Sequence, residues 1–369
     1  MANYYLLTLH ETPAGFQETF RVPHVESAEQ VMTDTTETQT YESMAHHDSR
    51  RKWLLSILKI VAVVVVLCAL GKQIGVLINE WSDKGPDLHK LIGSVDGIIL
   101  AAVAYVAAQV CFATFWGRLL NRAGAKSSWF DVLRAYSLGT LGKYVPGKAL
   151  VIIVRSALLS NPTISRLWIG IAVVYETVAM MAVAGMVATL CLLLVHPDQW
   201  LLWGGAAVLA IGATAMLHPA MVGRIARLAA SPFGQLTDDF PLARWNTALI
   251  RWGALEIGGW ALAGISFVQA ARVAGIECGS PGDWAVMTGT VALATAAGFL
   301  VVFMPAGVGV RELIIIHVLG PRYGVSQVVL ASLVLRVIWT VAEASLAGLL
   351  YGATPVVRRL NRSATSKTA

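Results

Sequence analysis

The chain alternates long apolar runs with short charged loops. Six of these runs, at about 18 to 28 residues each, are long enough for a helix to cross the hydrocarbon core of a bilayer. They cover residues 53–78, 98–117, 168–195, 200–217, 250–271 and 327–351. Repeated runs of this length predict an all-α polytopic membrane protein with six full transmembrane helices.

Two further apolar regions, residues 129–159 and 284–319, are broken by proline and glycine. The first contains Leu-Gly-Lys-Tyr-Val-Pro-Gly-Lys at 141–148, and the second contains Pro-Ala-Gly-Val-Gly-Val-Arg-Glu at 305–312. Such a break leaves backbone groups without partners, and lipid cannot satisfy them. The apolar sequence after each break is also too short to cross a bilayer. We therefore expect two re-entrant helix pairs. The alternatives are a tight surface turn at each break and a total of eight spanning helices.

The loop charges predict how these segments are oriented. Arg50, Arg51 and Lys52 precede the first run, whereas loop 79–97 carries four acids and two lysines. The positive-inside rule then places both termini in the cytoplasm. The later basic loops obey the same rule only if the two broken regions enter the membrane from opposite faces. The sequence thus predicts an inverted repeat, an arrangement found in transporters with a central binding site.

Composition supports a membrane protein and excludes several other classes. Hydrophobic residues make up 56% of the chain and charged residues 14%, and the mean hydropathy is +0.64. We expect residues 1–52 to be a disordered cytoplasmic tail, 53–355 a transmembrane domain of the cell inner membrane, and 356–369 a basic cytoplasmic tail. The cysteines and histidines show no metal-binding spacing, and there is no phosphate-binding loop for a nucleotide. No cofactor or metal is predicted.

Ionisable residues lie inside the predicted spans at Glu176, Glu256, Arg336 and Glu343. Each would cost about 2.5–3.5 kcal/mol if it faced lipid without a partner. One interpretation is a buried ion pair that joins helices, between Arg336 and either Glu176 or Glu343. The other is a binding site for a phosphate group, completed by cations from the two broken regions.

The second interpretation defines a candidate substrate site at the two breaks. Arginine side chains and helix N-termini both bind phosphate oxygens, and glycine allows the backbone to approach a ligand closely. The site comprises Lys143, Tyr144, Pro146, Gly147, Lys148, Arg155, Glu176, Pro305, Gly307, Gly309, Arg311, Glu312, Arg336 and Glu343.

The two break motifs, followed by Leu335-Arg336 in the last span, resemble the lysylphosphatidylglycerol synthase transmembrane region, also called the flippase-like domain family. The resemblance covers residues 53–355, with Ala306 in place of an expected glycine. In full-length members this region precedes a soluble aminoacyl-transferase domain and is held to move the aminoacylated lipid between leaflets. Because the chain continues for only about twenty residues after its last span, the resemblance implies the lipid-handling half and no synthase activity.

Two functions follow as expectations. The first is a lipid transporter of flippase or scramblase type, which handles an anionic or polyprenyl-phosphate headgroup and is not an enzyme. The alternative is a membrane enzyme or accessory subunit that acts on lipid-linked substrates. The absence of paired carboxylates and of histidine-rich motifs favours the first. Expected partners are membrane lipids with a phosphate headgroup, and a second copy or a lipid-synthesising enzyme. No nucleic-acid partner is expected.

Overall fold

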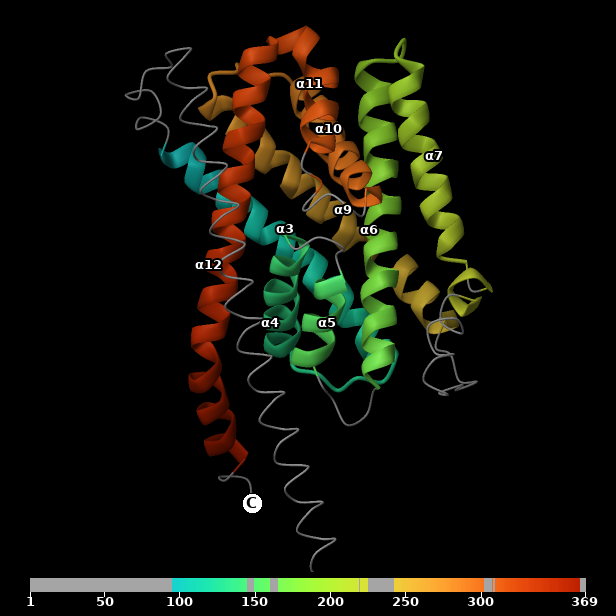
Figure 1. Ribbon diagram of the computed structural model, residues 1–369, viewed down its shortest axis with the longest axis vertical. Helices are drawn as coiled ribbons and strands as arrows, with labels where there is room; N and C mark the ends of the chain where they lie inside the picture. Colours follow the sequence, from blue (N-terminus) through green and yellow to red (C-terminus); the bar gives the residue numbers. More distant parts are fainter. Residues whose placement is uncertain are drawn as a thin grey trace, which may run out of the picture. The chain divides into compact units, whose positions relative to one another are not determined.

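The computed structural model describes residues 95–144, 149–159, 165–218, 220–224, 242–301, 307 and 309–365. Every regular element in these ranges is a helix (Figure 1). The predicted tail 1–52 and the first predicted span, 53–78, lie outside the described residues. So do four members of the candidate site, namely Pro146, Gly147, Lys148 and Pro305.

The helices follow the apolar pattern closely. Their bounds are α3 Val95–Arg122, α4 Trp129–Thr140, the 3-10 helix η1 Leu141–Tyr144, α5 Ala149–Leu158, α6 Arg166–Val195, α7 Trp200–Met216, α9 Leu242–Val273, α10 Pro281–Leu300, α11 Val310–Tyr323 and α12 Val325–Thr365. Among the described helices, five contain segments long and apolar enough to cross a membrane: Val95–Arg122, Arg166–Val195, Thr247–Val273, Pro281–Leu300 and Val325–Val357. The fold is therefore that of a membrane-embedded helical protein.

Helices α7 and α10 differ from the expected pattern. Helix α7 is apolar but has only 17 residues, so it is shorter than the other candidate spans. Helix α10 has 20 residues and is long enough to cross, although its sequence was expected to form one arm of a re-entrant pair. It begins before residue 284 because Pro281 occupies its first turn and Ser280 forms a capping box with Asp283.

Each broken region forms two helices that contact one another. Helices α4 and α5 pack together on either side of η1, and α10 packs against α11. The α4–α5 pair lies in the lower half of Figure 1, and the α10–α11 pair lies in the upper half. Each break thus lies between two helices that contact one another.

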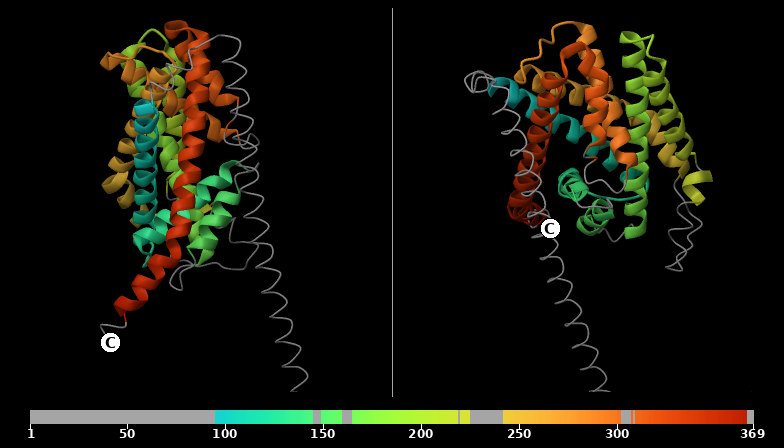
Figure 2. Two further views of the ribbon diagram at one scale, coloured as in Figure 1. Left: turned by 90° about the vertical axis from the view of Figure 1, so that its left-hand side faces the viewer. Right: turned by 45° about the horizontal axis from the view of Figure 1, so that its top comes forward.

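Small residues allow the long helices to approach closely. A side chain at Gly185 of α6 would meet the backbone of Ala210 of α7 at 2.8 Å. Helix α6 also packs against α10, and α3 packs along α9 (Figure 2). Close backbone contact of this kind is the usual way in which helices associate in lipid. Helices α3, α6, α9 and α12 surround the polar side chains of the candidate site.

Candidate functional site

A cavity of about 100 Å³ lies between the two broken regions and the long helices. This volume has room for several water molecules, which is the scale of a phosphate group. Its lining includes three cations, Lys143, Arg155 and Arg311. It also includes aromatic side chains, among them Tyr105, Tyr136, Phe112, Trp260 and Trp339.

Arg155 on α5 forms one side of the cavity. Its Nη1 donates to Oε2 of Glu176 on α6 at 2.9 Å, and its guanidinium carbon lies 3.8 Å from the ring centroid of Tyr136. Tyr136 donates its hydroxyl hydrogen to the other oxygen of Glu176 at 3.2 Å. The side chains of both ion-pair partners are at most 5% exposed. The Nε–H of Arg155 is buried without a partner in the described residues, so this donor remains for a ligand.

Two glycines allow Arg155 to reach this position. A Cβ atom at Gly139 would lie 2.4 Å from Cγ of Arg155, so the arginine stem passes where any other residue would project. A Cβ atom at Gly142 would lie 2.8 Å from the backbone nitrogen of Val151, and this close approach holds η1 against α5. The glycines before the first break therefore fix the path of Arg155 into the cavity.

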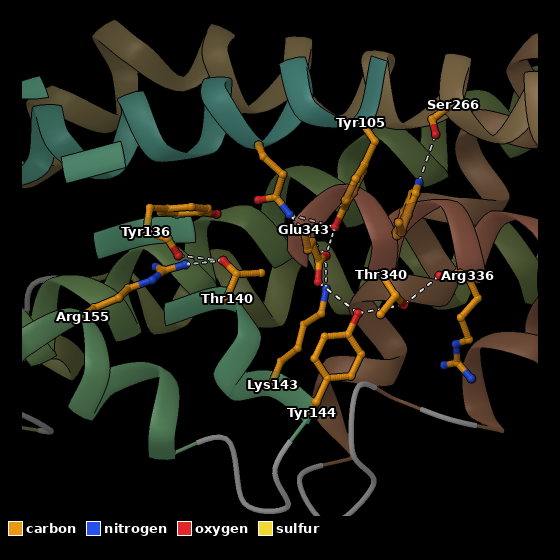
Figure 3. A network of polar contacts seen from close by, with 12 residues as sticks. Tyr105, Tyr136, Thr140, Lys143, Tyr144, Arg155, Ser266, Arg336, Thr340 and Glu343 are labelled. Atoms are coloured by element: carbon orange, nitrogen blue, oxygen red, sulfur yellow. Dashed lines mark hydrogen bonds and ion pairs between the residues drawn. The ribbon is translucent and has the colours of Figure 1, made fainter. Parts of the chain in front are cut away.

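A second cluster surrounds Glu343 of α12 (Figure 3). Its Oε1 accepts from the Lys143 ammonium and the Tyr105 hydroxyl, and more weakly from Nε2 of Gln109 at 3.4 Å. Its Oε2 accepts from the Tyr144 hydroxyl at 3.0 Å. These donors come from α3 and η1, so the carboxylate joins α12 to elements that are far from it in sequence. Four donors satisfy it fully.

The second break is fixed by glycine and by Glu312. Gly307 and Gly309 have φ angles of 69° and 87°, which larger residues rarely adopt. The backbone N–H of Gly309 donates to Oε2 of Glu312 at 2.7 Å. The other oxygen of Glu312 lies 3.0 Å from Nη1 of Arg336. The start of α11 is thereby tied to α12.

Arg311, next to Glu312, differs from the other cations of the site. Its guanidinium carbon lies 4.8 Å from the ring centroid of Trp339, and Gly298 makes room for its stem. Trp339 is held in place because it stacks on Tyr105 at 4.2 Å and donates to Oγ of Ser266 at 3.0 Å. Arg311 has no carboxylate partner among the described residues. It therefore presents a positive charge to the cavity.

The ion pairs differ from those expected from the sequence. Arg336 was predicted to pair with Glu176 or Glu343, but it pairs with Glu312. Glu176 and Glu343 pair with Arg155 and Lys143 instead. The reason is positional: Arg155 is only 21 residues before Glu176 and lies on the adjacent helix, whereas Arg336 faces the start of α11. Glu176 and Glu343 are thus each neutralised by a cation from the first broken region.

Sequence reasoning missed several polar and aromatic members of the site: Tyr105, Gln109, Tyr136, Thr140, Ser266, Trp339 and Thr340. A signal was available in the sequence. Polar residues four apart, such as Tyr105 with Gln109 and Tyr136 with Thr140, share one face of an apolar helix. Such a pair marks the side of the helix that faces protein rather than lipid.

The assembled cavity offers hydrogen-bond donors and positive charge. Glu176 and Glu343 are both held by cations, which leaves Arg311 as the lining cation without a carboxylate partner among the described residues, and the Nε–H of Arg155 as a buried donor without a partner there. In the described ranges there is no group of three or more His, Cys, Asp or Glu residues that could hold a metal ion. The arrangement suits an anion with several acceptor oxygens.

Comparison with known proteins adds no further assignment. Neither a scan against models of protein families nor a search of curated proteins found a match.

Proposed function

We propose that this chain is an integral membrane lipid transporter of flippase or scramblase type, and that its cavity binds the phosphate headgroup of an anionic or polyprenyl-phosphate lipid. Its place would be the inner membrane of the cell, with both termini in the cytoplasm, as the basic loops favour.

The charge of the cavity region is the observation that carries this proposal. Among the described residues, the ion pairs and the cation beside Trp339 bring together four cations, Lys143, Arg155, Arg311 and Arg336, and three carboxylates, Glu176, Glu312 and Glu343. One positive charge therefore remains, and it belongs to Arg311. Charged groups at membrane depth are costly and are usually kept for binding or transport. A phosphate oxygen would neutralise Arg311 and accept the Nε–H of Arg155.

The helix arrangement supports transport as well. The α4–α5 and α10–α11 pairs both contribute to the cavity, through Arg155 and Arg311. We interpret them as corresponding arms of an inverted repeat, with the substrate at their meeting point. In this interpretation α10 and α11 enter from the face opposite to α4 and α5. The 20 residues of α10 also allow it to cross completely, which would give the eight-span alternative.

We infer movement of a lipid rather than chemistry on it. A carboxylate that acts as a general acid or base must be within reach of the substrate and exchange a proton with it. Glu343 is held by four donors, and Glu176 is held by Arg155 and Tyr136. The groups that face the cavity are thus suited to bind a headgroup.

Replacing Arg311 by glutamine tests this function. The variant keeps a planar polar side chain beside Trp339 but loses the charge. We expect it to insert and fold, and to lose translocation of fluorescent phosphatidylglycerol in proteoliposomes by about 10- to 100-fold, because a charged hydrogen bond contributes about 1.5–3 kcal/mol.

Arg118→Gln is the matched control. Arg118 also lies over a tryptophan, 4.5 Å from the ring centroid of Trp252, but it is exposed and does not line the cavity. Wild-type translocation by both variants would contradict the proposed function. Equal loss in both variants would do the same, because it would attribute the effect to general electrostatics.

A further inference from the structure

Glu256, on the long helix α9, is a buried acid that the proposed headgroup site does not use. It is 0% exposed, and both of its carboxylate oxygens are without a hydrogen-bond partner in the described part of the chain. An ionised carboxylate in such a place would need a cation or several donors. Glu256 has neither among the described residues, so the geometry requires it to be the neutral, protonated acid.

The groups around Glu256 are acidic or weakly polar. Glu176 on α6, Tyr136 on α4 and Cys111 on α3 are close enough to interact with it electrostatically. The contact between α6 and α9 is fixed nearby, because Nε1 of Trp260 donates to the carbonyl oxygen of Met180 at 3.2 Å. Trp260 and Met180 lie one helical turn after Glu256 and Glu176, respectively.

The remaining titratable groups of the packed helices are engaged elsewhere. On α10, Asp283 accepts from Ser280, Arg322 and Tyr323 at the start of the helix. On α12, Arg336 and Glu343 pair with Glu312 and Lys143. The nearest cation to the two acids is therefore Arg155, which is bound to Glu176.

We infer that Glu176 and Glu256 form a proton-binding pair linked to the headgroup cavity, so that a doubly charged phosphate binds together with about one proton. This inference rests on the proposed headgroup binding at Arg311. A singly charged phosphodiester is neutralised by Arg311 alone. A phosphomonoester or diphosphate carries more charge and needs Arg155 as well.

The exchange balances in atoms and charge. The bond from Arg155 Nη1 to Glu176 breaks, and a bond from Arg155 to a phosphate oxygen forms. Glu176 would then be an ionised acid beside Glu256 with no cation, which the buried site cannot support. A proton from solvent converts Glu176 to the carboxylic acid. Binding is therefore coupled to proton uptake for lipids that carry a phosphomonoester or a diphosphate. Such a lipid would be transported together with a proton.

Titration calorimetry on the purified full chain tests the link, without any variant. The ligands are farnesyl monophosphate, which carries close to two charges above pH 7.5 because its second pKa is about 6, and dihexanoylphosphatidylglycerol, which carries one. Measurements in buffers with different ionisation enthalpies give the protons taken up. We expect about one proton with farnesyl monophosphate and none with the phosphodiester. The farnesyl monophosphate affinity should fall about tenfold per pH unit above pH 7.5.

Variants assign the proton to its residue. Glu176→Gln should bind farnesyl monophosphate with no proton uptake and no pH dependence. The double variant Arg155→Gln/Glu176→Gln removes both charges, and should lose both the proton uptake and the preference for the doubly charged ligand, while phosphodiester binding weakens by the loss of the single hydrogen bond from Arg155. Glu256→Gln should leave uptake unchanged and remove one infrared carbonyl band of a protonated carboxylic acid.

The possible failures are distinct. Binding of farnesyl monophosphate without proton uptake, or uptake that persists in Glu176→Gln, overturns the proton link and leaves the headgroup site standing. Loss of proton uptake in Glu256→Gln would place the proton on Glu256 and overturn its assignment to Glu176. If neither ligand binds the wild-type chain, the proposed function fails and the link fails with it.

Discussion

The two buried ion pairs of the site, Lys143–Glu343 and Arg155–Glu176, differ in how completely they are satisfied. In the first, one carboxylate collects donors from Lys143, Tyr105, Tyr144 and Gln109. In the second, Arg155 keeps an Nε–H without a partner in the described residues and borders a cavity. The acids are equally buried, at 2% exposure each. Burial alone therefore does not distinguish an ion pair that joins helices from one that can exchange its partner.

This difference assigns separate roles to the two clusters. The Glu343 cluster connects α3, η1 and α12 and has few donors left to offer. In the function proposed above, the Arg155 cluster releases its cation to a ligand. Removing one partner of a buried ion pair is destabilising, whereas replacing both by apolar groups is often tolerated. Mutation of each pair, singly and together, separates the roles.

The largest effect is expected at Glu343. Glu343→Leu should lower the free energy of unfolding by about 3–5 kcal/mol, because it leaves Lys143 buried without its acid. Adding Lys143→Met should recover only part of this loss, since the hydroxyls of Tyr105 and Tyr144 still lack their acceptor. Thermal unfolding in detergent measures both variants. Full recovery in the double variant would mean that the hydroxyl contacts contribute little.

A smaller net effect is expected at the other pair. Glu176→Leu alone should also cost about 3–5 kcal/mol, but Arg155→Met/Glu176→Leu should return close to wild-type stability. Among the described residues, only the Tyr136 hydroxyl and, through a long contact of 3.5 Å, the Thr140 hydroxyl lose a partner. The same double variant should no longer bind farnesyl monophosphate with a proton. A double variant that stays as unstable as the single one would show that the Arg155 cluster, too, is needed for folding.

The smallest effects are expected at the glycines that place Arg311 beside the cavity. Gly309→Ala should cost about 1–2 kcal/mol from its positive φ angle alone. Gly307→Ala should cost more, since its Cβ would also lie 2.9 Å from Cα of Gly298. Gly253→Ala, at a helical site with open space, is the control and should be neutral or slightly stabilising. Equal losses of stability in Gly307→Ala and Gly309→Ala would mean that the backbone at residue 307 can shift away from Gly298 and does not hold Arg311 in one position.

The helices and their charged residues could be predicted from the sequence, but their partners could not. The lengths of the apolar runs predicted the spans that contain Glu176 and Arg336, because a run must match the thickness of the membrane to cross it. Proline and glycine indicated the break before α11 for a local chemical reason. Lys143 and Glu343 are 200 residues apart, however, and their contact depends on how whole helices pack. The start of α10 was placed at residue 284 rather than at Pro281, because the capping role of Ser280 was not considered.

A structure of the protein in nanodiscs that contain anionic lipid, determined by electron cryomicroscopy, tests the headgroup site most directly. We predict phosphate density in the cavity, within hydrogen-bond distance of the guanidinium of Arg311 and of the Nε–H of Arg155. The density should disappear in Arg311→Gln and persist in Arg118→Gln. Phosphate density confined to the exposed basic residues at the helix ends, with a cavity that holds only water, would contradict the account.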